Sequence, residues 1–458
     1  MDQFDLFSPL DYRYLNGPLR KRSEIYFSEN ARVHYQALVE VALVKALSKQ
    51  GVCSAKIASE VAKAALKVKA AEVYAEEAKI KHDVRALANV LRSKVSKEAK
   101  PFIHFSATSY DIVDTASALR YKKAVLELVL PELTRLLKLW IKIALREKKT
   151  LQIGRTHGQH AEPITFGFAM SSYINRLGKS ISNMEWTANN LEGKFSGAVG
   201  SYNASSLLVK NPQKLEKDIM ADLGLKTGLH STQVVEPESL MDLLHSTMEA
   251  FTVLANFSDD MRNLQRSEIS EIMESFGSKQ VGSSTMPHKR NPINFENVKS
   301  MWKAFVPRAI TFYMDGISEH QRDLTNSASQ RFVPELFLAL LVSSERLEKV
   351  SQNLVVDRAA MKKNFDSSRE NVLAEPLYIL LAKHGHENAH EVVRELTVKA
   401  KQKNVAVLEL AKSDKEISEY LKKFSKSELS FIENPETYIG LSAKKTEEVC
   451  SYWKKRFK

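Results

Sequence analysis

The chain is poor in the residues that reverse its direction or cross-link it. Its 458 residues include 16 Gly and 13 Pro, whereas a β-sandwich or barrel needs turn residues every ~10 positions. The two cysteines, Cys53 and Cys450, are nearly the whole chain apart and belong to no Cys-x-x-Cys or Cys/His pattern. An all-β fold, long disordered regions, a disulfide framework and a thiolate metal site are therefore not expected, and a reducing compartment fits.

Long hydrophobic runs are also missing. The longest apolar stretch, residues 337–342, is far shorter than the ~18 residues that a membrane span requires. The first residues, MDQFDLFSPLDYRY, carry acids where a secretory signal has a basic start and an apolar run. We expect a soluble, cytoplasmic protein that does not contact a membrane.

Basic residues are in excess, with 67 Lys+Arg against 55 Asp+Glu and a formal net charge of +12. The basic residues alternate with Glu along helical segments, and the sequence has no aromatic-basic or zinc-finger motif. The charge therefore favours an anionic small-molecule substrate more than a nucleic acid.

Helix-forming residues dominate many windows, so we predict an all-α fold. A capped amphipathic helix is predicted over 28–50. Longer helices are predicted over 111–148, 164–193, 236–276, 295–317 and 334–364. The 111–148 run is apolar on most sides and must be buried on most sides, and Pro131 is expected to bend it without ending it.

Such long helices with short connections predict an antiparallel bundle. We expect an N-terminal helical domain over 1–108, the bundle over 109–364 and a C-terminal helical domain over 365–458. The Lys-rich tail, KKTEEVCSYWKKRFK, is predicted to be a solvated last helix.

Four short segments hold small, polar and ionisable residues that helix packing does not require. They are KHDV (81–84), HFSATSYDIVDTA (104–116), GRTHGQHAEP (154–163) and GSSTMPHKRNP (282–292). In the last segment, which we call the signature loop, Gly and Ser precede three basic side chains held between two prolines. A serine becomes a base only where neighbouring charges stabilise its alkoxide, and a loop that closes over substrate excludes water. This composition favours abstraction of a weakly acidic carbon-bound proton.

Histidines mark two of the other segments. His157 lies between Thr156 and Gly158, just ahead of a helix that we expect to start at Pro163, and a histidine is the usual proton donor near neutral pH. His160 is more simply a structural residue. No Cys and no His-Glu-x-x-His spacing accompany them, so we predict no metal.

Two helix starts suit an anion. In KHDV, Asp83 is a plausible N-cap for the following helix, and this capping does not exclude a role for His82 at the substrate. Thr108 and Ser109 begin the long helix, where backbone N–H groups and the helix dipole favour a carboxylate or phosphate. Simple capping is the alternative, but the third residue after Ser109 is Ile112, where a capping box has Glu or Gln.

Taken in order along the chain, these segments resemble the fumarase/aspartase superfamily and, within it, the adenylosuccinate lyases. The resemblance extends from Ser8 to about Gly385 and includes QRDLTNSASQR at 321–331. It implies an α-helical C–N lyase of purine biosynthesis that releases fumarate from adenylosuccinate, giving AMP, and from the analogous succinyl-aminoimidazole-carboxamide ribotide. It also implies that no cofactor is required.

The resemblance assigns roles to individual residues. Ser283 corresponds to the general base, Lys289 and Asn291 to the residues that hold the substrate carboxylate, and His157 to the general acid, with His82 beside it. The further substrate contacts that it implies are Arg13, Tyr14, Asp83, Thr108, Ser109, Thr156, Gln159, Gln233, Arg322, Ser327 and Arg331. Arginine suits a phosphate because its planar fork donates two parallel hydrogen bonds.

Helix length predicts the quaternary state. A helix over 111–148 is roughly 55 Å long at ~1.5 Å per residue. Thr108 and Ser109 then lie at one end and His157 beyond the other, although all three are assigned to one small substrate. We therefore expect other subunits to complete each active site, and the resemblance to the superfamily implies that the assembly is a homotetramer.

Three alternatives stay open. A carboxymuconate cycloisomerase has a similar signature loop but a substrate without phosphate, against which Arg322 and Arg331 argue. Argininosuccinate lyase has Gln where this chain has His288. A catalytically silent helical scaffold or nucleic-acid binder has no physical reason to keep Ser283 and His157.

Overall fold

The structure is a computed structural model that describes residues 8, 10–277, 285–286 and 288–458. The chain forms two compact units. Unit 1 comprises Met1–Thr134, Lys179–Leu254 and Ser300–Glu345, and unit 2 comprises Arg135–Gly178, Ala255–Lys299 and Arg346–Lys458. The sequence predicts three consecutive domains divided at residues 108 and 364, whereas each of these units combines several separate segments of the chain. The three-domain division stays a prediction.

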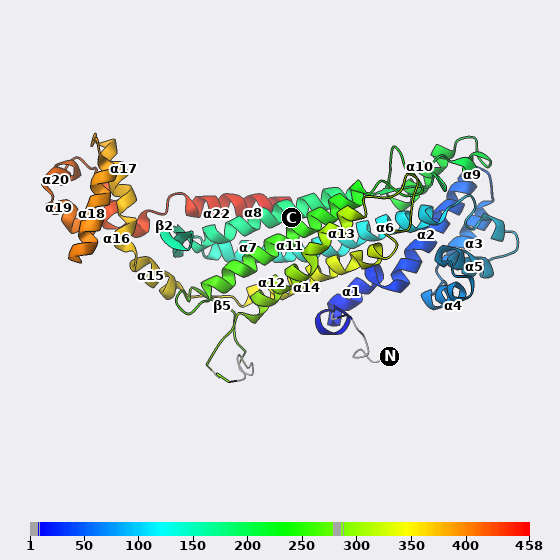
Figure 1. Ribbon diagram of the computed structural model, residues 1–458, viewed down its shortest axis with the longest axis horizontal. Helices are drawn as coiled ribbons and strands as arrows, with labels where there is room; N and C mark the ends of the chain where they lie inside the picture. Colours follow the sequence, from blue (N-terminus) through cyan, green and yellow to red (C-terminus); the bar gives the residue numbers. More distant parts are fainter. Residues whose placement is uncertain (1–7, 9, 278–284, 287) are drawn as a thin grey trace. The chain divides into compact units, whose positions relative to one another are not determined.

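Unit 1 is built almost entirely of helices. Its elements are η2 (Leu10–Tyr14), α1 (Gly17–Phe27), α2 (Glu29–Lys49), α3 (Ala55–Ala65), α4 (Ala70–Ile80), α5 (Asp83–Ser93), η3 (Lys100–Phe102), α6 (Ser109–Ala124), η4 (Val125–Val129), β3 (Glu192–Gly193), α9 (Asn203–Ser206), α10 (Pro212–Leu223), β4 (Lys226–Thr227), η5 (Val306–Arg308), α13 (Ala309–Met314) and η6 (Ser329–Phe332). Figure 1 shows α2 beside α6 in this unit.

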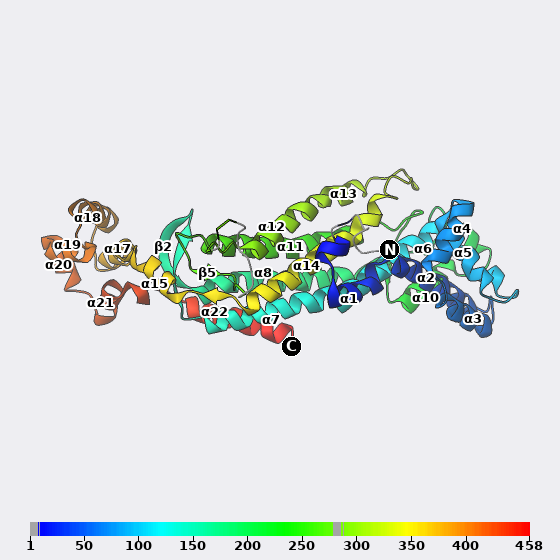
Figure 2. The ribbon, with the colours of Figure 1, turned by 90° about the horizontal axis from the view of Figure 1, so that it is seen from below.

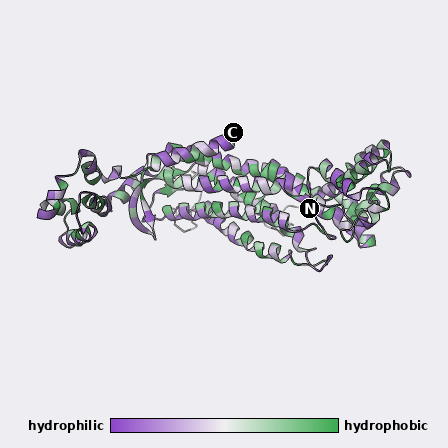
Figure 3. Ribbon diagram, turned by 90° about the horizontal axis from the view of Figure 1, so that it is seen from above, coloured by the Kyte–Doolittle hydropathy of each residue, from purple (hydrophilic) through white to green (hydrophobic). Residues whose placement is uncertain are grey.

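Five long helices have residues in both units. They are α7 (Leu130–Arg146), α8 (Phe166–Asn189), α11 (Glu238–Leu264), α12 (Ile293–Phe305) and α14 (Val333–Gln352). Hydrophilic and hydrophobic segments alternate along these helices in Figure 3, as expected where one side of a helix packs and another faces water.

Unit 2 adds a β-hairpin and the C-terminal helices. Its elements are β1 (Leu151–Thr156), β2 (Gln159–Thr165), β5 (Ile272–Met273), β6 (Val355–Val356), α15 (Arg358–Asp366), α16 (Arg369–Val372), α17 (Ala374–Lys383), α18 (Ala389–Lys403), α19 (Val407–Ser413), α20 (Lys415–Leu421), α21 (Lys426–Glu433), η7 (Pro435–Thr437) and α22 (Ser442–Arg456). Figure 2 shows the hairpin, labelled at β2, next to α15.

Local sequence explains several helix boundaries. The predicted 28–50 helix is α2, and the Ser28 hydroxyl caps it by accepting the Ala31 N–H at 3.1 Å. Helical residues continue without a break from Ser109 to Arg146 through the π-helical segment η4. Proline lacks an N–H and crowds the carbonyl four residues earlier, so a π-helical segment just before Pro131 lets the helix continue, as predicted.

Other helices end earlier than predicted. The 236–276 prediction becomes α11, which stops at Leu264, and the 334–364 prediction is interrupted after Gln352 by β6. Met273 and Ile272 of β5 pair with Val355 and Val356 of β6. These apolar residues satisfy a helical pattern equally well, so their pairing depends on a partner about 80 residues away in the sequence.

Aromatic packing fills the helical core of unit 2. The rings of Trp140 and Phe257 stack with centroids 4.2 Å apart, and Tyr173 and Phe295 each meet Phe257 edge-on. The Trp140 indole N–H donates to the Ser351 hydroxyl at 3.1 Å, which satisfies its one buried donor.

The tail is packed along one side, not fully solvated as predicted. In α22, Cys450 and Trp453 are buried, and the Trp453 indole N–H donates to the Asn175 amide oxygen of α8 at 3.0 Å. The sequence shows Trp453 among lysines, and only the contact with α8 reveals that its ring is needed for packing.

The described residues confirm the predicted all-α fold class. Their strands form three two-stranded sheets, β1–β2, β3–β4 and β5–β6, which are too small to form a core of their own. None of the described helices combines the length and the apolar character that crossing a membrane demands.

Candidate active site

Five of the predicted site residues line one cavity in unit 1. The cavity has a volume of about 460 Å³, and its lining includes His82, Asp83, Ser109, Ser327 and Arg331. These residues come from the start of α5, the start of α6 and the segment before α14. The Arg331 guanidinium lies 3.7 Å from the Asp83 carboxylate, so the two opposite charges form an ion pair in the lining of this cavity.

His82, and not Asp83, is the N-cap of α5. Helix α5 begins at Asp83, and His82 Nδ1 accepts the Arg85 backbone N–H at 3.2 Å. A neutral His82 that accepts at Nδ1 carries its proton on Nε2. The capping bond therefore fixes the ring and leaves a donor on the nitrogen that faces away from the helix, while the side chain stays half-exposed.

The N-cap of α6 lies one residue before Ser109, from which the capping pattern was counted. Thr108 is the N-cap, and its backbone N–H donates to the Asp111 carboxylate at 2.8 Å. The expectation that no capping partner follows the helix start is wrong, because it counted from Ser109 and overlooked Asp111. Ser109 is the first helical residue and lines the cavity.

The Arg322 guanidinium lies over the Tyr110 ring, with its Cζ 3.4 Å from the ring centroid. Its Nη1 donates to the Asn326 amide oxygen at 3.1 Å. Its Nε and Nη2 are buried and have no hydrogen-bond partner within the described residues. Two buried donors without acceptors are costly, so they point to an acceptor supplied by a ligand.

Arg322 belongs to a second, smaller cavity of about 120 Å³ in the same unit. Gln330 and Ser117 line both cavities, which are therefore adjacent. Asp114 also lines the smaller cavity and accepts the Val235 N–H at 3.0 Å. Burial raises the pKa of Asp114 to about 6.

Two other predicted groups of unit 1 lie outside the larger cavity. The Gln233 backbone N–H donates to the Gln321 carbonyl at 3.2 Å, which joins the Gln233 segment to the one that carries Arg322. Arg13 is exposed and Tyr14 half-buried in η2, and neither is among the described residues that line the two cavities.

His157 lies at the tip of a β-hairpin, not ahead of a helix. Thr156 pairs with Gln159, and His157 and Gly158 form the connection with φ values of 55° and 75°. Two successive residues with positive φ make the tight turn whose twist suits a two-residue hairpin. Thr156, His157 and Gln159 are all exposed. Because Pro163 lies inside β2 and α8 starts at Phe166, the prediction that Pro163 starts a helix is wrong.

A buried carboxylate ties this hairpin to its surroundings. Glu271 is fully buried and accepts hydrogen bonds from Arg155 Nη2 at 2.6 Å, Gln152 Nε2 at 2.8 Å and Asn364 Nδ2 at 2.8 Å. On the other strand, His160 Nδ1 lies 2.5 Å from the Ser368 hydroxyl. The structural interpretation of His160 stays a prediction.

The signature loop is described only in part. Ser283, the predicted base, lies outside the described residues. Lys289 is exposed, and its N–H donates to the Met286 carbonyl at 3.0 Å. The Arg290 carbonyl accepts from the Gln265 amide at 3.2 Å, and Asn291 is half-buried just ahead of α12.

Comparison with known proteins identifies the family. The family model described as lyase matches residues 14–305, and that described as adenylosuccinate lyase C-terminal matches residues 318–439. The adenylosuccinate lyase of Pyrococcus horikoshii is 36% identical over 451 residues, covering 97% of each chain. The chain belongs to the adenylosuccinate lyase family.

Further relatives support the family assignment and the fold. The adenylosuccinate lyase of Archaeoglobus fulgidus is 33% identical, with 97% of this chain and 98% of the relative covered. The crystal structure of 3-carboxy-cis,cis-muconate lactonizing enzyme from Pseudomonas putida has a TM-score of 0.82 at 22% identity, covering 97% of this chain and 98% of that chain. At this identity the second match shows a shared fold and nothing about the reaction.

Several residues that position the candidate site were not predicted from the sequence. Asp111, Lys194 and Glu271 are buried ionisable groups and Asp114 is half-buried, and each holds a segment that carries a predicted site residue. The Gly-rich run GKFSGAVGS around Lys194 was a signal that was available. In the part of the chain that the structure describes, no three His, Cys, Asp or Glu side chains group as metal ligands do.

Proposed function

We propose that this chain catalyses the β-elimination of fumarate from adenylosuccinate, giving AMP, and the same reaction on the succinyl-aminoimidazole-carboxamide ribotide. The family assignment carries this proposal, together with the cavity that five of the residues implied by the resemblance line. The reaction breaks one C–N bond and one C–H bond, and the electron pair of the C–H bond becomes the double bond of fumarate.

Ser283 is the base in this proposal. Its alkoxide takes the proton from the carbon next to a substrate carboxylate, and Lys289 and Asn291 stabilise the negative charge that builds up on that carboxylate. Two further features support an anionic intermediate here. The loop around Ser283 carries three basic residues, and the whole chain has a net charge of +12.

His157 is the acid that donates a proton to the departing nitrogen, with Thr156 and Gln159 orienting the substrate. Its position at the exposed tip of a hairpin suits a residue that reaches into a site formed with other chains. His82, whose capping bond leaves Nε2–H as a donor, orients the substrate in the larger cavity beside Asp83.

The nucleotide phosphate is assigned to Arg322, Ser327 and Arg331, with Arg13 and Tyr14 as further contacts. The unpartnered Nε and Nη2 of Arg322 support this assignment, since a phosphate supplies the acceptors that these donors lack. Thr108 and Ser109 receive a substrate carboxylate at the start of α6, and Gln233 lies near Arg322 through its bond to Gln321.

We also propose that the active protein is a cytoplasmic homotetramer with shared sites. The unbroken helical run from Ser109 to Arg146 is roughly 55 Å long at ~1.5 Å per residue. One chain therefore does not readily supply both Ser109 and His157 to a single small substrate. The three-domain division at residues 108 and 364 belongs to this proposal, and no cofactor takes part in it.

The test follows two reactions spectroscopically. One is fumarate release from adenylosuccinate, the carboxamide ribotide and argininosuccinate, and the other is ring opening of carboxymuconolactone to carboxymuconate. Turnover is expected for the first two substrates alone, and turnover of either of the others alone contradicts the proposal. Ser283→Ala is expected to lower kcat by several orders of magnitude, about 4 kcal/mol or more, with AMP binding retained. An active Ser283→Ala protein with an inactive Ser284→Ala protein moves the base by one residue.

A further inference from the structure

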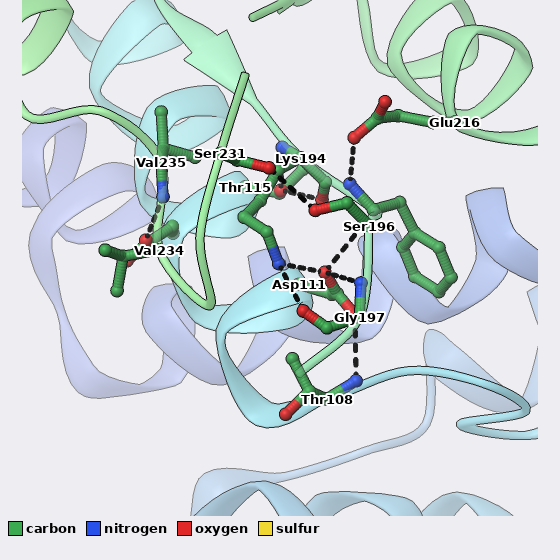
Figure 4. Close-up of polar contacts among 12 residues, drawn as sticks. Thr108, Asp111, Thr115, Lys194, Ser196, Gly197, Glu216, Ser231, Val234 and Val235 are labelled. Atoms are coloured by element: carbon green, nitrogen blue, oxygen red, sulfur yellow. Dashed lines mark hydrogen bonds and ion pairs between the residues drawn. The ribbon is translucent and has the colours of Figure 1, made fainter. Parts of the chain in front are cut away.

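Asp111 lies directly behind the predicted anion-binding turn and is fully buried. One of its carboxylate oxygens accepts the Thr108 N–H at 2.8 Å. The other accepts hydrogen bonds from the backbone N–H groups of Ser196 at 3.1 Å and Gly197 at 3.3 Å. The same oxygen forms an ion pair with the Lys194 ammonium. Figure 4 shows these contacts converging on Asp111 from two segments of the chain.

Lys194 is as deeply buried as its partner, with 1% of its surface exposed. Its ammonium also donates to the Gly197 carbonyl at 3.2 Å. Its backbone is fixed as well, because its N–H donates to the Thr115 hydroxyl at 3.0 Å and that hydroxyl donates to its carbonyl at 2.9 Å. The lysine is thus held against α6 at both ends of its side chain.

A lone carboxylate at this position conflicts with binding an anion. Asp111 is in the first turn of α6, two residues from Ser109. A full negative charge there is attracted by the helix dipole, and it cancels part of the positive potential that the dipole and the backbone N–H groups offer to a substrate carboxylate. In a buried setting the repulsion between the two negative charges is poorly screened. The capping bond from Thr108 nevertheless requires the acceptor, so the charge needs compensation within the protein.

We propose that Lys194 is a positioning residue for the reaction, which neutralises Asp111 so that the Thr108–Ser109 turn keeps both its cap and its affinity for an anion. The proposal rests on the proposed function for the identity of the anion, a substrate carboxylate. Lys194 does not touch the substrate in this arrangement and acts through Asp111. The role is electrostatic, so it depends on the charge of Lys194 and not only on its volume.

The same loop provides a matched control. Glu216 is also buried and holds the loop from its other side, by accepting the Phe195 N–H at 2.7 Å and the Tyr202 hydroxyl at 2.5 Å. Within the described residues, these hydrogen bonds of Glu216 go to the loop and not to the first turn of α6. Glu216→Gln therefore weakens the loop without changing the charge behind Ser109.

The experiment compares kcat and KM for fumarate release in Lys194→Gln, Lys194→Met, the double variant Asp111→Asn with Lys194→Met, and Glu216→Gln. Lys194→Gln, which keeps a donor toward Asp111, and Lys194→Met are both expected to raise KM by roughly tenfold or more at an effective dielectric of about 20. The double variant, which leaves no net charge, is expected to recover most of that loss. Glu216→Gln is expected to lower Tm with KM close to that of the wild type.

Two results overturn the proposal. One is an unchanged KM in a folded Lys194→Gln protein, and the other is a double variant no better than Lys194→Met. If Lys194→Met does not fold, Lys194→Gln and the double variant still decide the question. If the wild type releases no fumarate, the proposed function fails by itself. Titration with succinate then tests Lys194, where weaker binding by Lys194→Gln supports the role and equal binding contradicts it.

Discussion

Buried ionisable residues carry much of the organisation of unit 1. Asp111, paired with Lys194, connects α6 to the segment that holds Ser196. Asp114, one turn further along α6, connects the helix to the segment that holds Val235. A buried ion pair adds little net stability when both partners are present, but removing one partner leaves an uncompensated charge. These residues therefore hold geometry more than they add free energy of folding.

Asp114 makes protein stability depend on pH with a definite sign. Burial raises its pKa to about 6, whereas an unfolded chain has a value near ~4. The folded state then holds the proton more firmly, so the stabilising contribution is complete below about pH 4 and is lost as pH rises to about 6. Asp114→Asn keeps an acceptor for the Val235 N–H. At pH 7.5 its free energy of unfolding is expected to exceed that of the wild type by about 2 kcal/mol, and at pH 4 this advantage is expected to be absent.

Denaturant titrations of both proteins at several pH values measure this difference. Asp323→Asn is the control of opposite sign, because hydrogen bonds from the Thr325 side chain and backbone lower the pKa of Asp323. In the wild type, Asp323 therefore contributes more stability as the pH rises. A stability difference for Asp114→Asn that does not change between pH 4 and 7.5 contradicts the assigned protonation.

At the scale of elements, the hairpin β1–β2 is the part of the candidate site with the least intrinsic stability. A two-stranded ribbon is marginally stable in water, and its tip residues are exposed. The Arg155–Glu271 contact, one residue before Thr156, supplies the missing constraint. Gly154 allows the strands to approach there, since a Cβ would lie 2.7 Å from the Glu162 carbonyl oxygen.

Arg155→Lys tests whether this contact sets the position of His157. Lysine keeps the charge but loses the fork that donates to both Glu271 oxygens. We expect kcat to fall by roughly tenfold to a hundredfold with a smaller change in KM, because misplacing an acid affects the transition state most. Steady-state kinetics measure both constants.

Arg358→Lys is the control for that substitution. Arg358 makes an equivalent two-pronged contact with buried Glu147 in the same unit, but not with the strand end that carries His157. It is expected to keep kcat within about twofold. Equal losses in the two variants indicate a general effect on unit 2 and contradict a specific role for Arg155.

The packing of α22 on α8 depends on a position without a side chain. A Cβ on Gly178 overlaps the Trp453 ring, which is 4% exposed and held by its bond to Asn175. Gly178→Ala is expected to destabilise the protein by about 1–3 kcal/mol, although alanine favours helices by ~1 kcal/mol over glycine. Thermal unfolding measures the change.

Two further variants test whether the effect of Gly178→Ala comes from the contact with Trp453. Ser172→Ala, at an exposed position of the same helix, is expected to leave Tm unchanged or slightly higher. Adding Trp453→Leu to Gly178→Ala is expected to remove most of the clash, so that the two substitutions are not additive. A Gly178→Ala protein as stable as the wild type shows that α22 does not pack as described.

For the whole molecule, the testable consequence is that subunits share active sites. Mixing inactive Ser283→Ala and inactive His157→Gln proteins under subunit exchange is expected to restore roughly a quarter of wild-type activity, since a quarter of hybrid sites then draw both intact residues from different chains. Fumarate release before and after exchange gives the measurement. No recovery in verified hybrids, or a fully active monomer in sedimentation, contradicts shared sites.

The long helices and the chemistry-bearing segments followed from the sequence alone. Helical periodicity is a local property, so the uninterrupted run through Pro131 and the capped start at Ser28 were predictable. The grouping of His82, Ser109 and Arg331 around one cavity was expected from family resemblance, and the structure of unit 1 brings them together. The roles of these residues remain proposals.

Tertiary structure decided what depends on distant partners. His157–Gly158 is a hairpin turn because β1 and β2 pair and Glu271 anchors them, although Pro163 in the same segment suggested a helix start. Lys194 reaches Asp111 across 83 residues of sequence. Local sequence states which residues favour a helix or a turn, but a buried charge is tolerated only where the fold brings its partner, and that partner is set by packing of the whole chain.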